Sequence, residues 1–231
     1  TTLHLFDREF EHIIIHTGQH YDYNMDKIFF EQLNLRSPDY NLNIGSGTQA
    51  EQTGKMMMQI EEILIKEKPD AVLVFADPNT PLAGALAAAK LHIPVIHFEA
   101  GCRSFNKKMP EEINRIVADH CSDFLLAPDK TSYENLVREG IDKNNIRIVG
   151  DIVFDSTMRN KEIAGKSKIL ERFELEPNKY VLVTVHRAEN TDNLDNLKEI
   201  IDFVNYLSRK ICVVFPIHPR TKKTMEINNL R

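Results

Sequence analysis

The chain has 231 residues and lacks the features that mark membrane proteins and nucleic-acid binders. A transmembrane helix needs about 20 consecutive apolar residues, and no apolar run approaches that length. The formal net charge of -5 excludes a general nucleic-acid binder, because phosphate contacts need clustered lysine and arginine. The N-terminal segment has no basic region followed by an apolar core, so we expect no signal peptide. Neither a membrane nor a nucleic acid is therefore an expected partner.

Cysteine is also scarce. The three cysteines, Cys102, Cys121 and Cys212, are odd in number and show no C-x-x-C spacing. This pattern predicts reduced thiols in a cytoplasmic protein rather than disulfides or a zinc site. The histidines and carboxylates show no H-E-x-x-H or similar spacing, so we expect no metal ion.

The common nucleotide-binding loops are missing as well. No G-x-G-x-x-G motif follows a strand and opens a helix, so a nicotinamide cofactor is not expected. The segment Gly45–Lys55 resembles a phosphate loop, but it lacks the G-x-x-x-x-G-K-[ST] spacing. Met56 also stands where such a loop has its magnesium-binding hydroxyl.

Short apolar runs alternate with helical stretches along the whole chain. The expected strands are His12–His16, Ala71–Ala76, Pro94–Phe98, Phe124–Ala127, Ile146–Val149, Tyr180–Val185 and Ile211–Phe215. The expected helices are Tyr23–Leu33, Glu51–Glu67, Pro81–Leu91, Pro110–His120, Thr131–Glu139 and Leu194–Ser208. Pro81 and Pro110 each suit the first helical position. Repeated strand–helix–strand units predict an α/β protein with mostly parallel sheets that helices cover on both faces.

The polar stretch Lys161–Lys179 has few strand signals and divides two α/β units. We read it as a helical or linking segment. The expected domains are therefore residues 1–165, a nearly complete Rossmann-like unit, and residues 166–231, a linker with the start of a second unit.

Unusual polar residues follow the carboxyl ends of the expected strands. The strand-end groups are Thr17–His20, Asp77, His97 with Glu99, His186 with Arg187, and His218 with Arg220. Ligands of open α/β sheets bind at this edge, so the set predicts a cleft. The alternative is that loops are polar in any protein, and for one loop taken alone the two interpretations are equally good.

The segment Ile93–Arg115 carries most of the functional information. An apolar strand ends at Glu99, where an unpaired carboxylate in buried surroundings is costly, which favours a functional role. Glu111 and Glu112 follow in the first turn of a helix, with Arg115 one turn later. Both glutamates could instead complement the helix dipole or pair with Arg115, and this structural role fits Glu112 better than Glu111. Asp77 could equally be the start of an Asp-Pro turn.

At these residues the chain resembles the non-hydrolysing UDP-N-acetylglucosamine 2-epimerases. The matching segments include H-T-G-Q-H-Y-D at His16–Asp22, H-F-E-A-G-C-R-S-F at His97–Phe105, M-P-E-E-I-N-R at Met109–Arg115, H-R-A-E-N-T-D at His186–Asp192 and H-P-R-T at His218–Thr221. They run in family order over nearly the whole chain. The resemblance implies the GT-B fold, in which two Rossmann-like domains face each other across the active site.

The resemblance also implies an isomerase that interconverts UDP-GlcNAc and UDP-ManNAc by eliminating and re-adding UDP, for polysaccharide precursor synthesis. It places Asp77, Glu99, Glu111 and His186 in catalysis, the histidine at the leaving phosphate. It places Gln19, Arg115, Arg187 and His218 in contacts with the nucleotide sugar. Some relatives bind a second, activating UDP-GlcNAc through residues matching Gln19, Arg187 and His218, so two roles are open for these three. We also expect a homodimer, and no cofactor because no net oxidation occurs.

The chain departs from the family pattern in three places. The family begins with a strand and a Gly-[TA]-Arg-Pro loop, and it continues past H-P-R-T to a T-D-S-G-G loop that holds UDP; neither loop is in this sequence. The usual Gly-Asp-Thr reads Ala76-Asp77-Pro78. We therefore expect the second domain to be incomplete here. The alternatives to the epimerase are a UDP-2,3-diacetamido glucuronate 2-epimerase, a GT-B glycosyltransferase and a non-catalytic sugar-nucleotide-binding fragment.

Overall fold

The computed structural model describes residues 9–18, 27–33 and 35–230. The chain divides into two compact units, Thr1–Ala164 and Gly165–Arg231. No helix in the described part of the chain is long and apolar enough to cross a membrane.

The first unit alternates strands and helices. Its strands are β1 (Ile15–His16), β2 (Tyr40–Asn41), β3 (Val72–Phe75), β4 (Val95–Phe98), β5 (Phe124–Ala127) and β6 (Ile146–Ile148). Its helices are α2 (Lys27–Gln32), α3 (Gln49–Glu67), α4 (Asn79–Lys90), α5 (Pro110–His120), α6 (Lys130–Arg138) and α7 (Ile152–Ala164), with a 3-10 turn at Lys143–Asn145. The predicted strands that correspond to β3, β4, β5 and β6 are confirmed, and their ends differ from the prediction by at most one residue.

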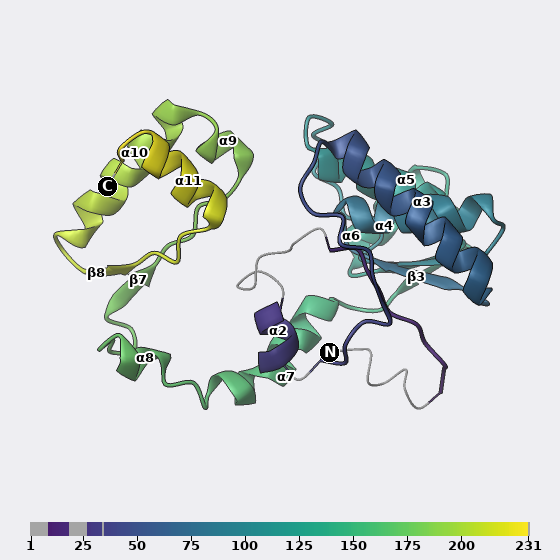
Figure 1. Ribbon diagram of the computed structural model, residues 1–231, viewed down its shortest axis with the longest axis horizontal. Helices are drawn as coiled ribbons and strands as arrows, with labels where there is room; N and C mark the ends of the chain where they lie inside the picture. The colour runs from purple at the N-terminus through teal and green to yellow at the C-terminus, as the bar shows by residue number, and fades with distance from the viewer. Residues whose placement is uncertain (1–8, 19–26, 34, 231) are drawn as a thin grey trace. The chain divides into compact units, whose positions relative to one another are not determined.

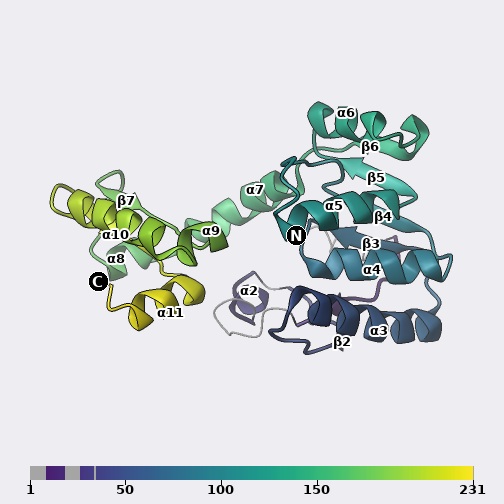
Figure 2. The same ribbon diagram turned by 90° about the horizontal axis from the view of Figure 1, so that it is seen from above.

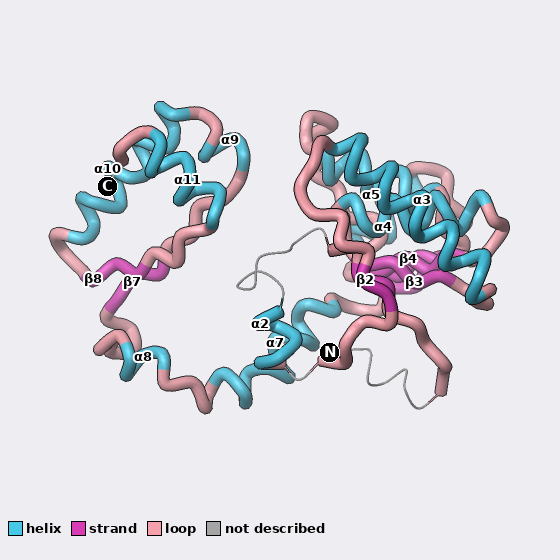
Figure 3. The backbone as a smooth tube through the Cα atoms, in the orientation of Figure 1, coloured by secondary structure: helices cyan, strands magenta, loops and turns pink. Residues whose placement is uncertain are grey.

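A four-stranded parallel sheet in the order β3-β4-β5-β6 forms the centre of this unit. Val72 pairs with Val95, and Ile96 pairs with Phe124, so the carboxyl ends of β3 and β4 meet at one edge. The helices α3, α4 and α5 lie side by side along one face of the sheet (Figures 1 and 2), and the strands run beneath them (Figure 3). Helix α4 connects β3 to β4 and α5 connects β4 to β5, each forming the crossover that neighbouring parallel strands require.

Local signals in the sequence fix the ends of these helices. The Thr48 hydroxyl accepts a hydrogen bond from the Glu51 amide at the start of α3, and Asp129 accepts one from the Ser132 amide at the start of α6. Pro110 occupies the first turn of α5, as predicted. The prediction for Pro81 was wrong, because α4 begins two residues earlier, at Asn79.

The apolar core lies between the sheet and its helices. One cluster joins α3, α4 and the first strands of the sheet through Met56, Ile60, Val74, Ala87 and Val95. A second cluster joins β5 and β6 to α6 through Leu125, Leu136 and Ile146. The small alanines of α4 let it approach the sheet closely, and a Cβ at Gly84 would make a tight contact of 3.2 Å with Val74 Cγ1.

The other face of the sheet differs from the prediction of helices on both faces. Phe124 lies on this face and is 53% exposed, and α7 has no buried residue. Helix α7 itself was not predicted, because Ile152–Ala164 has weak apolar periodicity and its helix needs little contact with the core. Strand β2 was also missed, since two residues give no sequence signal.

The second unit contains two parallel strands and four helices among its described residues. They are α8 (Ile169–Arg172), β7 (Tyr180–Leu182), α9 (Ala188–Thr191), α10 (Leu194–Ser208), β8 (Cys212–Val214) and α11 (Pro219–Ile227). Tyr180 pairs with Cys212 and Leu182 with Val214. Among the described residues of this unit, the buried apolar side chains are Leu197 and Ile201 of α10. The predicted strands and α10 are confirmed here, the strands being shorter than predicted.

Candidate active site

A small pocket lies where β3 and β4 end. It has a volume of about 120 Å³ and is lined by Ala76, Asp77, Glu99, Cys102 and Arg115. Asp77 follows β3, Glu99 follows β4, and Arg115 comes from α5. Three residues singled out by the sequence therefore share one pocket at the carboxyl edge of the sheet, where ligands of open α/β folds bind.

The backbone is strained at both carboxylates. Ala76, directly before Asp77, has φ 59°, and Glu99 itself has φ 64°. Non-glycine residues rarely adopt this left-handed conformation, which persists only where surrounding contacts hold it, often at functional sites. Gly101 also has positive φ, and a Cβ there would lie 2.3 Å from the Ser132 carbonyl oxygen. The turn after β4 is thus tightly constrained.

Helix α5 holds Asp77 from two sides. The Arg115 guanidinium makes an ion pair with the Asp77 carboxylate. The Asn114 side-chain amide donates hydrogen bonds to the Asp77 carbonyl oxygen at 2.9 Å and to Asn79 at 3.2 Å. Pro78 has φ -67° directly before α4, so the Asp-Pro pair serves as the entry to that helix. Asp77 is both a turn residue and a pocket residue.

Glu99 sits in an environment that favours its protonated form. Burial is the main cause that raises the pKa of Glu99, and the negative charges of Asp151 and Asp77 raise it further, while His97 opposes them. A carboxyl group whose pKa is raised toward neutral pH is suited to exchange protons with a substrate.

The two neighbouring glutamates of α5 have opposite environments. The Glu112 side chain is 1% exposed and accepts hydrogen bonds from the Ser104 amide and hydroxyl, the Phe105 amide and Arg115. Burial acts to raise the pKa of Glu112, but these hydrogen bonds outweigh it and lower the pKa to about 2. Glu111 is exposed, and among the described residues its side chain has no hydrogen bond or ion pair. Glu112 is therefore committed to holding the loop before α5, and Glu111 is accessible to a ligand.

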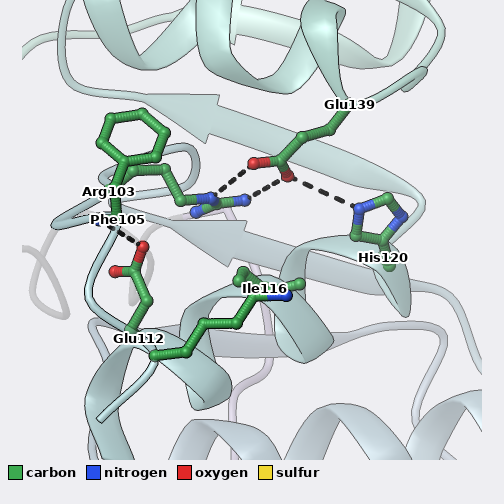
Figure 4. A pocket seen from close by; sticks show the side chains of 7 residues that line it. Arg103, Phe105, Glu112, Ile116, His120 and Glu139 are labelled. Carbon is green, nitrogen blue, oxygen red and sulfur yellow. Dashed lines mark hydrogen bonds and ion pairs between the residues drawn. The ribbon is translucent and has the colours of Figure 1, made fainter. Parts of the chain in front are cut away.

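A larger pocket of about 340 Å³ lies beside that loop (Figure 4). Two of its lining residues form a bidentate pair: Arg103 donates two hydrogen bonds to the Glu139 carboxylate, at 2.8 and 2.7 Å. His120 lies 3.5 Å from the same carboxylate. This pocket contains none of the residues proposed for catalysis.

Three residues near the smaller pocket were not predicted. Cys102 lines it, Asn114 holds Asp77, and Asp151 acts electrostatically on Glu99. Asp151 follows β6 and could have been found by the same signal as Asp77 and Glu99, a polar residue after a strand. Nothing in the sequence distinguishes Asn114 and Cys102, because their importance depends on contacts with distant residues.

The second unit brings together two of its predicted residues. The rings of His186 and His218 stack with centroids 5.5 Å apart. The His218 ring nitrogen Nδ1 accepts a hydrogen bond from the Arg220 amide at 3.1 Å, at the start of α11. His186 and the adjacent Arg187 are exposed and follow β7. Gln19 lies outside the described residues.

Comparison with known proteins identifies the family. A family model described as UDP-N-acetylglucosamine 2-epimerase matches residues 5–230. The chain belongs to this family. A UDP-N-acetylglucosamine 2-epimerase of Methanococcus maripaludis is 55% identical over 217 residues, which is 92% of this chain and 59% of that protein. A UDP-2,3-diacetamido-2,3-dideoxy-D-glucuronate 2-epimerase of Pseudomonas aeruginosa is 47% identical over 93% of this chain and 60% of that protein.

Solved structures of the family share the fold. The crystal structure of Methanocaldococcus jannaschii UDP-GlcNAc 2-epimerase in complex with UDP-GlcNAc and UDP is similar with a TM-score of 0.90 and 51% identity. The match covers 97% of this chain and 63% of that one. The expected α/β fold with parallel sheets is thus confirmed by this epimerase structure. The chain spans about three fifths of the length of the curated relatives it matches.

Proposed function

We propose that the protein is an isomerase that interconverts UDP-GlcNAc and UDP-ManNAc for polysaccharide precursor synthesis. Family membership supports the reaction class, since relatives at 53–55% identity carry the name UDP-N-acetylglucosamine 2-epimerase. The observation that carries the proposal is the pocket in which Asp77 and half-buried Glu99 lie together. An epimerisation at a carbon needs two groups that exchange a proton with it, and this pocket supplies two carboxyl groups.

The chemistry explains why acids and cations are needed together. The hydrogen at C2 of the sugar is not next to a carbonyl group, so a base alone does not remove it readily. When UDP leaves C1, positive charge develops there and the C2 hydrogen becomes more acidic. The reaction eliminates UDP, forms a 2-acetamidoglucal, and re-adds UDP after protonation on the opposite face. Donor groups at the diphosphate stabilise the negative charge that UDP gains.

In this proposal Asp77, Glu99 and Glu111 are the carboxyl groups of the acid–base set. The raised pKa of Glu99 supports a role in proton transfer. Arg115 lines the pocket and pairs with Asp77, so it orients that carboxylate and contacts the nucleotide sugar. Glu111 is included because it is exposed at the start of α5, whereas the Glu112 carboxylate is already occupied by hydrogen bonds.

We propose that residues 1–165 form the N-terminal Rossmann-like domain and that residues 166–231 begin the UDP-binding domain. His186 is placed at the leaving phosphate, and Gln19, Arg187 and His218 contact the substrate or a second, activating UDP-GlcNAc. The stacked pair of His186 and His218 supports a shared binding surface on the second unit. We further propose a cytoplasmic homodimer, consistent with three free cysteines, and light scattering on the purified protein tests the dimer.

Proton NMR in D2O tests the proposed reaction. The protein that contains this chain is incubated with UDP-GlcNAc, and the C2 proton signal is followed. Epimerisation replaces this proton by deuterium and produces UDP-ManNAc, whereas glycosyl transfer or binding alone leaves it unchanged. Variants Glu99→Gln and Asp77→Asn are expected to lower turnover by about 10²–10⁴-fold, the usual loss when acid–base catalysis is removed. If the C2 proton is fully retained when the enzyme is saturated with UDP-GlcNAc, the proposal is rejected.

A second candidate substrate is UDP-2,3-diacetamido glucuronic acid. The 47% identity to an epimerase of that sugar nucleotide favours this alternative over unrelated reactions. It differs from UDP-GlcNAc by a carboxylate and an additional acetamido group on the sugar. Comparison of kcat/KM for the two compounds under the same conditions decides between them, because specificity is a ratio of these constants.

A further inference from the structure

A buried chain of hydrogen bonds links the two turns that carry Asp77 and Glu99. Its centre is Asp119 of α5, whose side chain is 0% exposed. The Asp119 carboxylate accepts a hydrogen bond from His97 at 2.7 Å and one from the Gly101 amide at 3.0 Å. It also pairs with Arg103, 2.7 Å away and 1% exposed.

His97 extends this chain to the turn after β3. Its Nδ1 faces Asp119, and its Nε2 lies 3.0 Å from the carbonyl oxygen of Ala76, the residue before Asp77. Both partners are acceptors, so each nitrogen contributes a hydrogen when both bonds are made. The ring is fully buried and therefore connects two backbone turns without reaching solvent.

The two turns need such support. Ala76 and Glu99 both have left-handed φ values, which a polypeptide keeps only when its surroundings stabilise them. Asp119 holds the turn of Glu99 through the Gly101 amide, and it holds the turn of Asp77 through His97. One buried carboxylate is thus placed to set the positions of both pocket carboxylates.

We propose that Asp119 and His97 are positioning residues of the active site, acting together to fix Asp77 and Glu99 relative to each other. Neither touches the pocket, and this role rests on the proposed epimerase function. A proton must leave one face of C2 and arrive on the other, so both carboxyl groups have to be in place in the same enzyme. Misplacement by about 1 Å is enough to lower turnover by about 10²-fold.

Two variants of His97 test its hydrogen bond to Asp119 and its hydrogen bond to Ala76 separately. In His97→Asn the amide nitrogen takes the place of Nδ1, which keeps the bond to Asp119 and loses the bond to Ala76. In His97→Gln the amide nitrogen takes the place of Nε2, which keeps the hydrogen bond to Ala76 and loses the hydrogen bond to Asp119. If both links matter, each variant loses turnover.

Asp123→Asn is the matched control. Asp123 follows α5 by three residues and accepts a hydrogen bond from the Val95 amide at 2.8 Å, at the opposite end of the same strand β4. It supports β4 in the same chemical way as Asp119 but lies away from both turns. This variant is expected to lose stability and to keep its turnover.

The experiment measures kcat, KM and C2 deuteration of UDP-GlcNAc for the wild type, both His97 variants, Asp119→Asn and Asp123→Asn, well below each unfolding temperature. We expect kcat to fall at least 10-fold in the three network variants with KM within about threefold, and the amount of 2-acetamidoglucal released per turnover to rise. Normal kcat in these variants overturns the positioning role while the epimerase function stands. An equal loss of kcat in Asp123→Asn also overturns it, because general support of β4 would then explain the loss without a link between the two turns. An inactive wild type overturns the proposed function and this inference together.

Discussion

Replacing Glu112 by glutamine tests how the loop before α5 is held. The Glu112 carboxylate accepts hydrogen bonds from the Ser104 and Phe105 amides, both near 2.9 Å, and from Arg115 at 2.6 Å. Glutamine keeps one acceptor oxygen but directs an NH₂ group at backbone donors, and it removes the charge that Arg115 pairs with. A buried donor without a partner costs about 1–3 kcal/mol.

The pKa of Glu112 gives a second way to calculate how much this carboxylate contributes to the free energy of unfolding. The pKa of Glu112 is about 2 instead of its ordinary 4.5. Since one pKa unit corresponds to about 1.4 kcal/mol, the ionised form contributes at most roughly 3.5 kcal/mol to the free energy of unfolding. We therefore expect Glu112→Gln to lose roughly 2–3 kcal/mol. For a domain of this size that loss lowers Tm by about 5–10 °C.

The sign of the pH dependence follows from the lowered pKa. The ionised carboxylate stabilises the fold above the unfolded-state pKa, and this contribution disappears as the pH falls through 4.5 toward 2. The Tm difference between the wild type and Glu112→Gln should therefore be largest at pH 6–7 and shrink markedly by about pH 3. Thermal unfolding followed by circular dichroism over this range measures it.

The neighbouring residue supplies the control. Glu111→Gln makes the same chemical change on an exposed side chain, so its stability should stay within about 0.5 kcal/mol of the wild type. Its turnover should fall further than that of Glu112→Gln. Equal destabilisation by the two variants, or a Glu112→Gln effect that does not change with pH, refutes this account of the pair.

Three further outcomes are expected. Asp151→Asn should move the limb of the pH–rate profile that reports Glu99 toward lower pH, because removing a nearby negative charge lowers a pKa raised mainly by burial and secondly by Asp151; an unchanged profile contradicts this coupling. Gly101→Ala should cost at least about 2 kcal/mol in a denaturant titration, since its φ is positive and a Cβ would collide with backbone. Iodoacetamide should label exposed Cys212 before Cys102, whose pKa is raised by burial, and mass spectrometry of timed samples gives the order.

The sequence alone determined the alternation of strands and helices and the edge of the sheet that carries the site. Buried parallel strands are short continuous apolar runs, so β3, β4 and β5 could be read directly. Because parallel strands end at the same edge, polar residues after them predict a common site, and Asp77 and Glu99 do share one pocket. Motifs in family order pointed to the family.

Only the tertiary structure decided what each polar side chain contacts. Glu111 and Glu112 are adjacent and identical in type, yet Glu111 is exposed and Glu112 is buried, with 1% of its side chain exposed. The Glu112 carboxylate is surrounded by hydrogen-bond donors from a loop that folds back onto it. Asp119 and Asp123 look alike in the sequence, but they hold opposite ends of β4. Apart from Arg115, three residues from Glu112, the partners of these carboxylates come from segments 7 to 28 residues away. Local patterning fixes which face of a helix a residue occupies, but the groups that meet it there depend on how the whole unit packs.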